Sequence, residues 1–443
     1  MNCMNYFEKE LSTNCPISFH MPGHKNNSRR IKFLNKKIGE YDTTETHNHD
    51  NLHNPVGIIL ELQNRIQKEY QSIKSYPLVN GSTAGILTAL SYLPANSKIL
   101  IDKDSHMSVY NACEINNICF EYLPDDIEEL SNVLKNNYAA VLATTPSYYG
   151  VCKDLKVLHE VCKSNNTLLI SDFAHGAHLH KLNVKDGFLQ HHSDISITSL
   201  HKTLPALTSS AILNIYNKSI DLRRIEKYLS IYQTSSPSYL ILGSIASCIE
   251  FMNEKNIYEK TLGCIKKLLS KSIGLEYLNI HTNDDPTRIS ISTKGTNISG
   301  KMLYNALIKE GIECEMADAT NAVLIATPLN KAKDFTTLFK SVRKIDSTLS
   351  KTNDIAFDDI FSHTEKTFNT SQIKDKSYVQ VPIIESIGKI SKGYIALYPP
   401  YRPILLPGEK VTKEVVDIIS KFKDSILCDY SDIKNGLIAI LNF

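Results

Sequence analysis

The sequence lacks the features that mark secreted, zinc-binding and membrane-spanning proteins. Its ten cysteines lie at wide spacings and include no C-x-x-C pair, which argues against a disulfide framework and a structural zinc site. Residues 1–10 contain no basic region followed by an apolar region, so no secretory signal is visible. No apolar stretch approaches the ~18 residues of a membrane span. We therefore expect reduced thiols and a cytoplasmic protein.

The chain also has little net charge. The formal net charge is +2, whereas binding to nucleic acid or to an anionic membrane needs clustered positive charge. We therefore expect neither partner. Hydrophobic residues make up 42% and charged residues 22% of the sequence, as in ordinary globular enzymes. The 443 residues exceed the ~250 to 300 at which one core stops growing, so we expect two domains, or one large domain with appendages.

Residues 57–250 alternate short apolar runs with longer helical patterns. This alternation is typical of β-α-β units and a largely parallel sheet. The expected strands include residues 98–101, 139–143, 168–171 and 195–197, and polar residues follow each of them. In open α/β sheets ligands bind just beyond the carboxyl ends of the strands, so we expect a ligand site among these polar residues.

The pattern changes after about residue 260. Strand-like runs at 288–292 and 322–326 lie between helical segments, which is typical of an α+β arrangement. We therefore predict three parts: an N-terminal segment of residues 1–56 that contributes to the active site, a large domain of residues 57–260, and a smaller C-terminal α+β domain of residues 261–443.

Two residues in the large domain have the chemistry that pyridoxal 5'-phosphate (PLP) requires. Asp172 and Lys202 stand 30 residues apart, each just past a predicted strand. A lysine amine can hold PLP as a Schiff base, and a carboxylate can keep the pyridine nitrogen protonated so that the ring accepts electrons. An ordinary surface or strand-end role would explain either residue alone, so the constellation matters more than its members.

Two further features fit the same cofactor. The run Gly81-Ser82-Thr83-Ala84-Gly85 opens a helical pattern, where backbone N–H groups and hydroxyls can bind a phosphate. An ordinary helix N-cap explains the same run. His106 follows another predicted strand, where an imidazole can stack on the cofactor ring, and a loop histidine without a ligand is the alternative.

Two histidine clusters raise the question of a metal. One comprises His47, His49 and His53, and the other comprises His175, His178 and His180. Neither has the ligand spacing of a helical H-E-x-x-H motif, and no cysteine pair completes them. We predict no metal site.

Runs of residues over most of the chain resemble the Orn/Lys/Arg decarboxylases of aspartate-aminotransferase-like fold. The run Phe19-His20-Met21-Pro22-Gly23-His24-Lys25 is similar to that family's F-H-x-P-G-H-K. The other matching runs are, in order, 42–45 (DTTE), 51–55 (NLHNP), 80–85 (NGSTAG), 105–109 (SHMSV), 145–150 (TPSYYG), 172–178 (DFAHGAH), 199–207 (SLHKTLPAL), 234–239 (TSSPSY), 398–400 (YPP) and 406–409 (LPGE). The resemblance implies PLP fold type I, with a large, mainly parallel seven-stranded sheet sandwiched by helices and a smaller C-terminal α+β domain. It also implies a short form without the family's N-terminal wing domain.

The resemblance implies a role for each matching residue. Lys202 would be the Schiff-base lysine, Asp172 the partner of the pyridine nitrogen, and His106 the residue stacked on the ring. Ala174 would pack under the ring, and the phosphate would be held by Ser82, Thr83, Ser199 and His201. The catalytic set is then Lys202, His106, Asp172 and His201, the last assisting proton transfer. Ser235 or Ser236 would reach the phosphate of a neighbouring subunit, because sites of this fold lie at a dimer interface, and we expect a homodimer or tetramer.

The activity that the resemblance implies is PLP-dependent α-decarboxylation of a basic amino acid (arginine, lysine or ornithine) to a polyamine-pathway amine and CO2. The acidic partner of the substrate side chain has three candidates by motif position: Asp42, Glu45 and Glu385. The family's P-P-G-I-P reads Pro399-Pro400-Tyr401-Arg402-Pro403 here. Tyr401 and Arg402 would stand near the substrate entrance, so this departure bears on substrate choice.

Two rival functions stay open at this point. The first is another PLP reaction such as aminotransfer, in which Arg288 or Arg402 would grip the substrate carboxylate. The second is a catalytically inactive PLP-fold protein with a regulatory role.

Overall fold

The computed structural model describes residues 15–25, 38–46, 49–182, 184–185, 189–352, 367–368, 370–398, 402–423 and 426–442, with Thr370, Ser371 and Arg402 described by their backbone alone. Among these residues no helix is both long and apolar enough to cross a bilayer.

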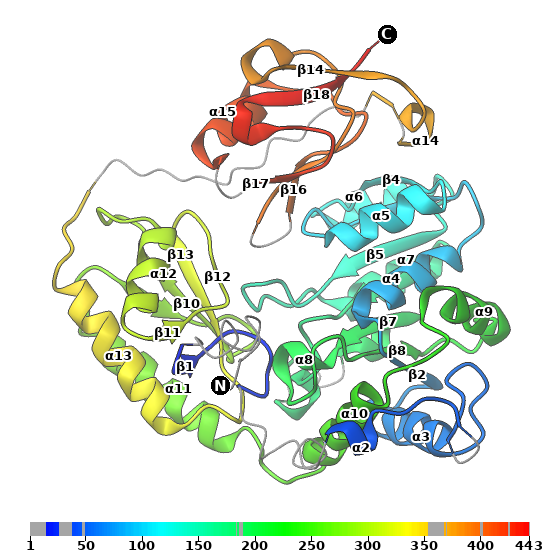
Figure 1. Ribbon diagram of the computed structural model, residues 1–443, viewed down its shortest axis with the longest axis horizontal. Coiled ribbons are helices and arrows are strands. Elements are labelled where there is room, and N and C mark those ends of the chain that lie inside the picture. Colours follow the sequence, from blue (N-terminus) through cyan, green and yellow to red (C-terminus); the bar gives the residue numbers. More distant parts are fainter. Residues whose placement is uncertain are drawn as a thin grey trace, which may run out of the picture.

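A seven-stranded sheet forms the centre of the large domain (Figure 1). Its strand order is β2-β8-β7-β6-β5-β3-β4. Strand β8 runs antiparallel to β2 and β7, and every other pair of neighbours is parallel. The bounds are β2 Lys74–Leu78, β3 Lys98–Ile101, β4 Cys119–Tyr122, β5 Ala140–Thr144, β6 Leu168–Asp172, β7 Ile195–Ser199 and β8 Ala211–Ile215. This sheet confirms the predicted fold class.

Helices cover both faces of the sheet because successive strand side chains point to opposite faces. Ile99 and Ile101 pack in one cluster with α4 (Gly81–Ser91), α5 (Met107–Ile115) and α9 (Leu222–Tyr232). Leu100, between them, packs on the other face with α6 (Ile127–Leu134) and α7 (Leu155–Ser164). Ile212 of β8 packs with α3 (Ile58–Tyr70) and α10 (Tyr239–Met252).

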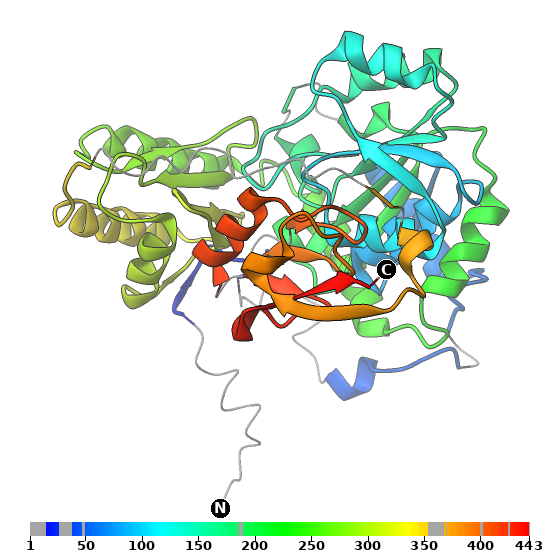
Figure 2. The ribbon, with the colours of Figure 1, turned by 90° about the horizontal axis from the view of Figure 1, so that it is seen from above.

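The C-terminal range contains two separate hydrophobic clusters. The first lies in an antiparallel sheet of order β12-β13-β10-β9, and the second joins the pair β14-β18 with the sheet β16-β15-β17. The first group comprises α11 Glu259–Ser272, β9 Asn279–His281, β10 Arg288–Ser292, α12 Gly300–Lys309, β11 Ile312–Glu313, β12 Met316–Ala317, β13 Asn321–Ile325 and α13 Ala332–Asp346; the second comprises α14 Thr370–Ile373, β14 Tyr378–Pro382, β15 Ile395–Leu397, β16 Arg402–Leu405, α15 Lys413–Lys421, β17 Ile426–Cys428 and β18 Leu437–Leu441. Figures 1 and 2 both show the first group (green to yellow) beside the large sheet. The three-part division by residue number stays a prediction.

The N-terminal segment links the first C-terminal group to the large domain. The sheet β12-β13-β10-β9 of that group is called the small sheet below. Strand β1 (Ile17–Ser18) pairs with β11 in parallel. Farther along, the Gly23 N–H donates to the carbonyl of His201 at 2.7 Å, and the Gly23 carbonyl accepts from the Thr327 hydroxyl at 2.9 Å. Residue 23 therefore lies directly against the helix α8 (Leu200–Thr203).

We predict that Gly23→Ala destabilises the protein. A Cβ at residue 23 would lie 2.5 Å from the Leu204 carbonyl oxygen and 2.6 Å from its nitrogen, and backbone atoms cannot rotate away. The expected loss is about 1–3 kcal/mol of unfolding free energy, typical of overpacking, measured by thermal or denaturant unfolding. Gly39→Ala is the control, because its Cβ would meet nothing within 4 Å. Equal stability of the two variants would contradict the close packing of Gly23.

Candidate active site

The carboxyl ends of the parallel strands β3, β6 and β7 bring the predicted residues together. His106 follows β3 and caps α5, Asp172 is the last residue of β6, and Ser199 is the last residue of β7. Lys202 lies in α8, one turn farther along the chain. Since β5, β6 and β7 are parallel neighbours, these side chains meet at one edge of the sheet, where ligands bind in open α/β folds.

Asp172 and Lys202 form an electrostatically coupled pair. Asp172 is 5% exposed, and its burial raises the pKa of its carboxyl group, while the charge of Lys202 acts to lower it. Lys202 keeps some accessible surface, but its enclosure by protein lowers the pKa of its amine. The negative charges of Asp172 and Glu315 act in the opposite direction and raise this pKa. Burial disfavours each charge and the partner favours it. A cationic pyridine nitrogen beside Asp172 would offset the cost of burying the carboxylate.

Two histidines flank this pair in uncharged form. The Nδ1 of His106 accepts from the Ser108 backbone N–H at 3.1 Å, which fixes the ring at the start of α5. Burial, together with the charge of Lys202, lowers the pKa of His106 to about 4, so the ring is neutral at pH 7. His201 lies with Nδ1 3.1 Å from the carbonyl of Ser210, and burial lowers its pKa as well.

A phosphate-binding arrangement lies next to them. Helix α4 starts at Gly81, whose φ of +75° favours glycine, and Ser82 and Thr83 form its first turn. The Gly81 N–H donates to the Ser209 carbonyl at 2.8 Å, and the Leu200 N–H donates to the Ser210 carbonyl at 3.0 Å. One short loop thus joins the start of α4 to the end of β7. There the Ser199 hydroxyl is buried without a hydrogen-bond partner in the described part of the chain.

These residues fit PLP. The helix N-terminus and the orphaned Ser199 hydroxyl suit its phosphate, Asp172 suits its pyridine nitrogen, and Lys202 suits its aldehyde. The Ala174 N–H donates to Asp172 Oδ1 at 3.2 Å, so Ala174 lies beside the carboxylate that would face the ring. The roles assigned to Ser82, Thr83, Ala174, Ser199 and His201 stay predictions.

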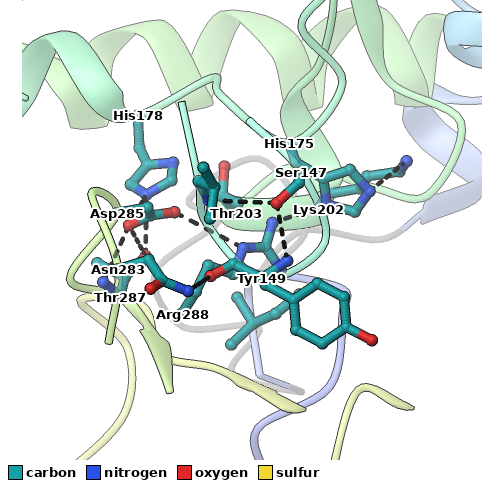
Figure 3. Close-up of polar contacts among 12 residues, drawn as sticks. Ser147, Tyr149, His175, His178, Lys202, Thr203, Asn283, Asp285, Thr287 and Arg288 are labelled. Carbon is teal, nitrogen blue, oxygen red and sulfur yellow. Dashed lines mark hydrogen bonds and ion pairs between the residues drawn. The ribbon is translucent and has the colours of Figure 1, made fainter. Parts of the chain in front are cut away.

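His175 and Arg288 also belong to the site, although sequence reasoning gave His175 no role there (Figure 3). Lys202 Nζ lies 3.1 Å from His175 Nε2. On the other side of the ring, Arg288 Nη2 lies 2.7 Å from His175 Nδ1, and the ring of Tyr148 packs 4.5 Å from that of His175. His175 stands in the DFAHGAH run, so that motif was its signal. Arg288 begins β10 of the small sheet, and no local pattern indicates its approach.

Glu315 is the acidic residue that the sequence did not single out. It is 6% exposed, its Oε2 accepts from the Met21 backbone N–H at 2.9 Å, and its charge raises the pKa of Lys202. By contrast, the predicted acidic candidates Asp42 and Glu385 are exposed, and Glu45 accepts from the Thr44 hydroxyl at 2.6 Å. None of the three is among the charges that shift the pKa of Lys202.

The remaining predicted residues are placed as follows. Tyr401 lies outside the described residues, and Arg402 begins β16 with its side chain undescribed. Ser235 and Ser236 are exposed. The neighbouring Thr234 N–H donates to Asn80 Oδ1 at 3.3 Å, which places this segment near the start of α4 in the same chain. Contact with another subunit stays a prediction.

The second histidine cluster is divided among different partners. His175 contacts Lys202 and Arg288, His178 Nε2 lies 3.2 Å from Asp285 Oδ1, and His180 Nε2 lies 2.7 Å from Glu69 Oε1. His47 of the first cluster lies outside the described residues. Within the described ranges, no three His, Cys, Asp or Glu residues form a group that could hold a metal ion.

The fold and the site define a PLP enzyme of fold type I. The chain superposes on the constitutive lysine decarboxylase of E. coli with a TM-score of 0.77 and 17% identity, covering 100% of this chain and 82% of that one. It also matches a serine palmitoyltransferase from S. paucimobilis solved with bound PLP, with a TM-score of 0.61 and 14% identity over 75% of this chain and 87% of that one.

The particular family follows from the sequence comparison. Residues 7–123 and 113–275 match the model of the Orn/Lys/Arg decarboxylase major domain, and the chain belongs to this family. The arginine decarboxylase of Bacillus subtilis (strain 168) is 26% identical over 460 residues, which cover 94% of this chain and 92% of that protein. The protein is therefore a decarboxylase whose cofactor is PLP, and the predicted family and cofactor are confirmed.

We predict that Ser199→Ala weakens PLP binding. The variant removes the buried hydroxyl that we assign to the phosphate, and a hydrogen bond to a charged group contributes about 1.5–3 kcal/mol, or roughly tenfold or more in Kd. Titration of cofactor-free protein with PLP, followed by visible absorbance, measures the effect. Ser196→Ala is the matched control, because Ser196 is buried and unpartnered on the same strand. An unchanged Kd for Ser199→Ala would refute the assignment.

Proposed function

We propose that this decarboxylase removes the α-carboxylate of a basic amino acid and that arginine is its best substrate. The observation that carries the proposal is the buried carboxylate of Glu315, whose negative charge acts to raise the pKa of Lys202. A cationic side chain of the substrate would find its counter-charge there. The similarity to the Bacillus subtilis arginine decarboxylase supports arginine over lysine and ornithine.

Each part of the site has a task in this reaction. When bound, PLP withdraws electrons from the Cα of the amino acid, so that CO2 can leave. The Asp172 carboxylate holds a proton on the pyridine nitrogen, His106 offers an uncharged ring face, and Lys202 Nζ delivers the proton that replaces the carboxylate at Cα. His201 lies beside Lys202 along α8 and would assist this transfer.

Enclosure of the site favours decarboxylation because the leaving carboxylate loses its hydration. Asp172, His175 and Arg288 are each 5% exposed or less. In such surroundings electrostatic interactions are stronger than in water. A substrate held at one end by Glu315 and at the other by the cofactor would present its carboxylate to this enclosed part of the site.

The first test is a product screen. Purified protein with PLP is expected to release CO2 from arginine and to form the corresponding amine, with slower release from lysine and ornithine. Lys202→Ala is expected to lose the activity, while Lys103→Ala, which removes a half-buried lysine paired with Asp125 at 3.1 Å, is expected to keep it. Conversion of an amino acid to its oxo acid without CO2 would establish aminotransfer instead.

The second test addresses Glu315. Glu315→Gln keeps the acceptor for the Met21 N–H but removes the charge, so we expect KM for arginine to rise about tenfold or more, as for loss of a charge-assisted hydrogen bond, with a smaller change in kcat. Glu313→Gln is the control, since Glu313 lies two residues away and accepts from the Tyr304 hydroxyl at 3.0 Å. Equal KM values for the two variants would remove Glu315 from substrate binding.

Three related predictions go beyond the decarboxylase assignment and remain proposals. They are a place in polyamine synthesis, a homodimer or tetramer with active sites at the dimer interface, and a cytoplasmic location. Support for assembly comes from two large apolar side chains that lie two residues apart at the start of α3, since exposed apolar residues mark interaction surfaces when they gather: Val56 and Ile58 are 79% and 61% exposed.

A further inference from the structure

Arg288 is held in place on several sides. It is 0% exposed, and its Nε lies 3.6 Å from Asp285 Oδ2. Asp285 is itself bound by His178 and by the Thr287 hydroxyl at 2.7 Å. Burial acts to raise the pKa of the Asp285 carboxyl group, but these partners and Arg288 lower this pKa to about 2. Gly150 packs on the stem of Arg288, where a Cβ would come within 2.9 Å of its Cβ and Cγ atoms. The guanidinium therefore has a fixed direction.

This direction determines the protonation of His175. A guanidinium has only N–H donors and stays protonated, so the 2.7 Å contact requires that Nδ1 of His175 accepts. A neutral imidazole with an accepting Nδ1 carries its proton on Nε2. That Nε2 faces Lys202 Nζ at 3.1 Å, so its N–H points at the lysine nitrogen (Figure 3).

Lys202 Nζ must then accept the hydrogen bond from His175 Nε2–H. An ammonium has three donors and no acceptor, whereas an uncharged amine offers a lone pair. The contact between an Nε2–H and Nζ is therefore satisfied only by the uncharged amine. If His175 carried its proton on Nδ1 instead, Nε2 could accept from a Lys202 ammonium, but two donors would then face each other at Arg288.

We propose that Arg288 is a positioning residue that fixes the proton of His175 on Nε2 and thereby keeps the amine of Lys202 uncharged in the cofactor-free protein. The uncharged amine is the form whose lone pair attacks the PLP aldehyde, with release of water. The inference rests on the proposed role of Lys202, but the state of His175 can be measured without it.

The surrounding charges agree with this arrangement. His175 is faced by Lys202, Arg288, His106 and His201 and by the ring of Tyr148. Burial lowers the pKa of His175 first, and a positive charge on any of these four groups lowers it further. Lys202 is faced by Asp172, Glu315, Arg288 and His175, and burial lowers its pKa against the two carboxylates. The cation of Arg288 therefore acts on both groups in the same direction.

The direct test is 15N NMR of the cofactor-free protein with labelled histidine, with the His175 signals assigned by their loss in His175→Phe. In the wild type we expect a protonated Nε2 and an unprotonated, hydrogen-bonded Nδ1. Arg288→Lys keeps a cationic donor and is expected to preserve this pattern, whereas Arg288→Met is expected to give a mixture of tautomers. Should Arg288→Met fail to fold with Asp285 unpaired, Arg288→Met with Asp285→Asn takes its place. An unchanged tautomer without Arg288 would overturn the proposal.

The second measurement is the rate at which cofactor-free protein combines with PLP as a function of pH. Loss of Arg288 is expected to raise the pKa of Lys202 and so to shift the pH profile of the rate to higher pH, because at a pH below the pKa the uncharged fraction falls about tenfold for each pH unit. Arg288→Lys should largely restore the rate. In the background of His175→Phe, Arg288→Met should lower this rate clearly less, because the tautomer of His175 no longer contributes. If Arg288→Met lowered the rate equally in both backgrounds, Arg288 would act on Lys202 through its charge alone, and the proposal would be overturned.

Failure of the proposed function gives a different result. If Lys202→Ala still bound PLP covalently, Lys202 would not be the attachment residue. The NMR pattern of His175 in Lys202→Ala would nevertheless stay Nε2-protonated if Arg288 sets it, so the two hypotheses are tested separately.

Discussion

The enclosure of two ionisable groups, Asp172 and Lys202, at the ends of neighbouring strands is the constraint on which the rest of the site depends. Burial acts against the charged form of each, and enclosed ionisable groups persist only where other groups compensate them. Helix α8 follows β7 immediately and sets the position of Lys202, while β6 ends at Asp172. The parallel pairing of β6 with β7 therefore brings the pair together, and PLP supplies the charge and the aldehyde that such a pair can use.

The small sheet and the N-terminal segment complete this site from outside the large domain. Arg288 at the start of β10 contacts His175, and Glu315 binds the Met21 backbone. Gly23 ties the same segment to the carbonyl of His201. Three parts of the chain that are distant in sequence thus converge on α8. A change in the position of the small sheet would move the guanidinium and the carboxylate together.

The sequence predicted the parts of the fold and site that follow from local patterns. Buried parallel strands are continuous apolar runs, so the strand at 98–101 was predicted with the bounds that it has. Asp172 and Lys202 were predicted because each follows such a run. Glu315 was not predicted, and Arg288 was considered only as a grip for the substrate carboxylate in aminotransfer. The contacts of both residues depend on how β10, β11 and β12 pair and pack, and pairing across long separations leaves no local pattern. The division of the C-terminal range into two hydrophobic clusters also depends on pairing between distant segments, so the sequence did not predict it.

The central claim is that Lys202 holds the cofactor, and the protein contains another enclosed lysine that competes for this role. Lys25 donates to the His20 and Ile325 carbonyls at 2.7 and 3.0 Å, and burial lowers its pKa to about 7. Reduction of the PLP-loaded protein with borohydride, followed by proteolysis and mass spectrometry, identifies the modified lysine. The account predicts a phosphopyridoxyl group on the peptide that contains Lys202. The same group on Lys25 or on any other lysine, with Lys202 unmodified, would contradict it.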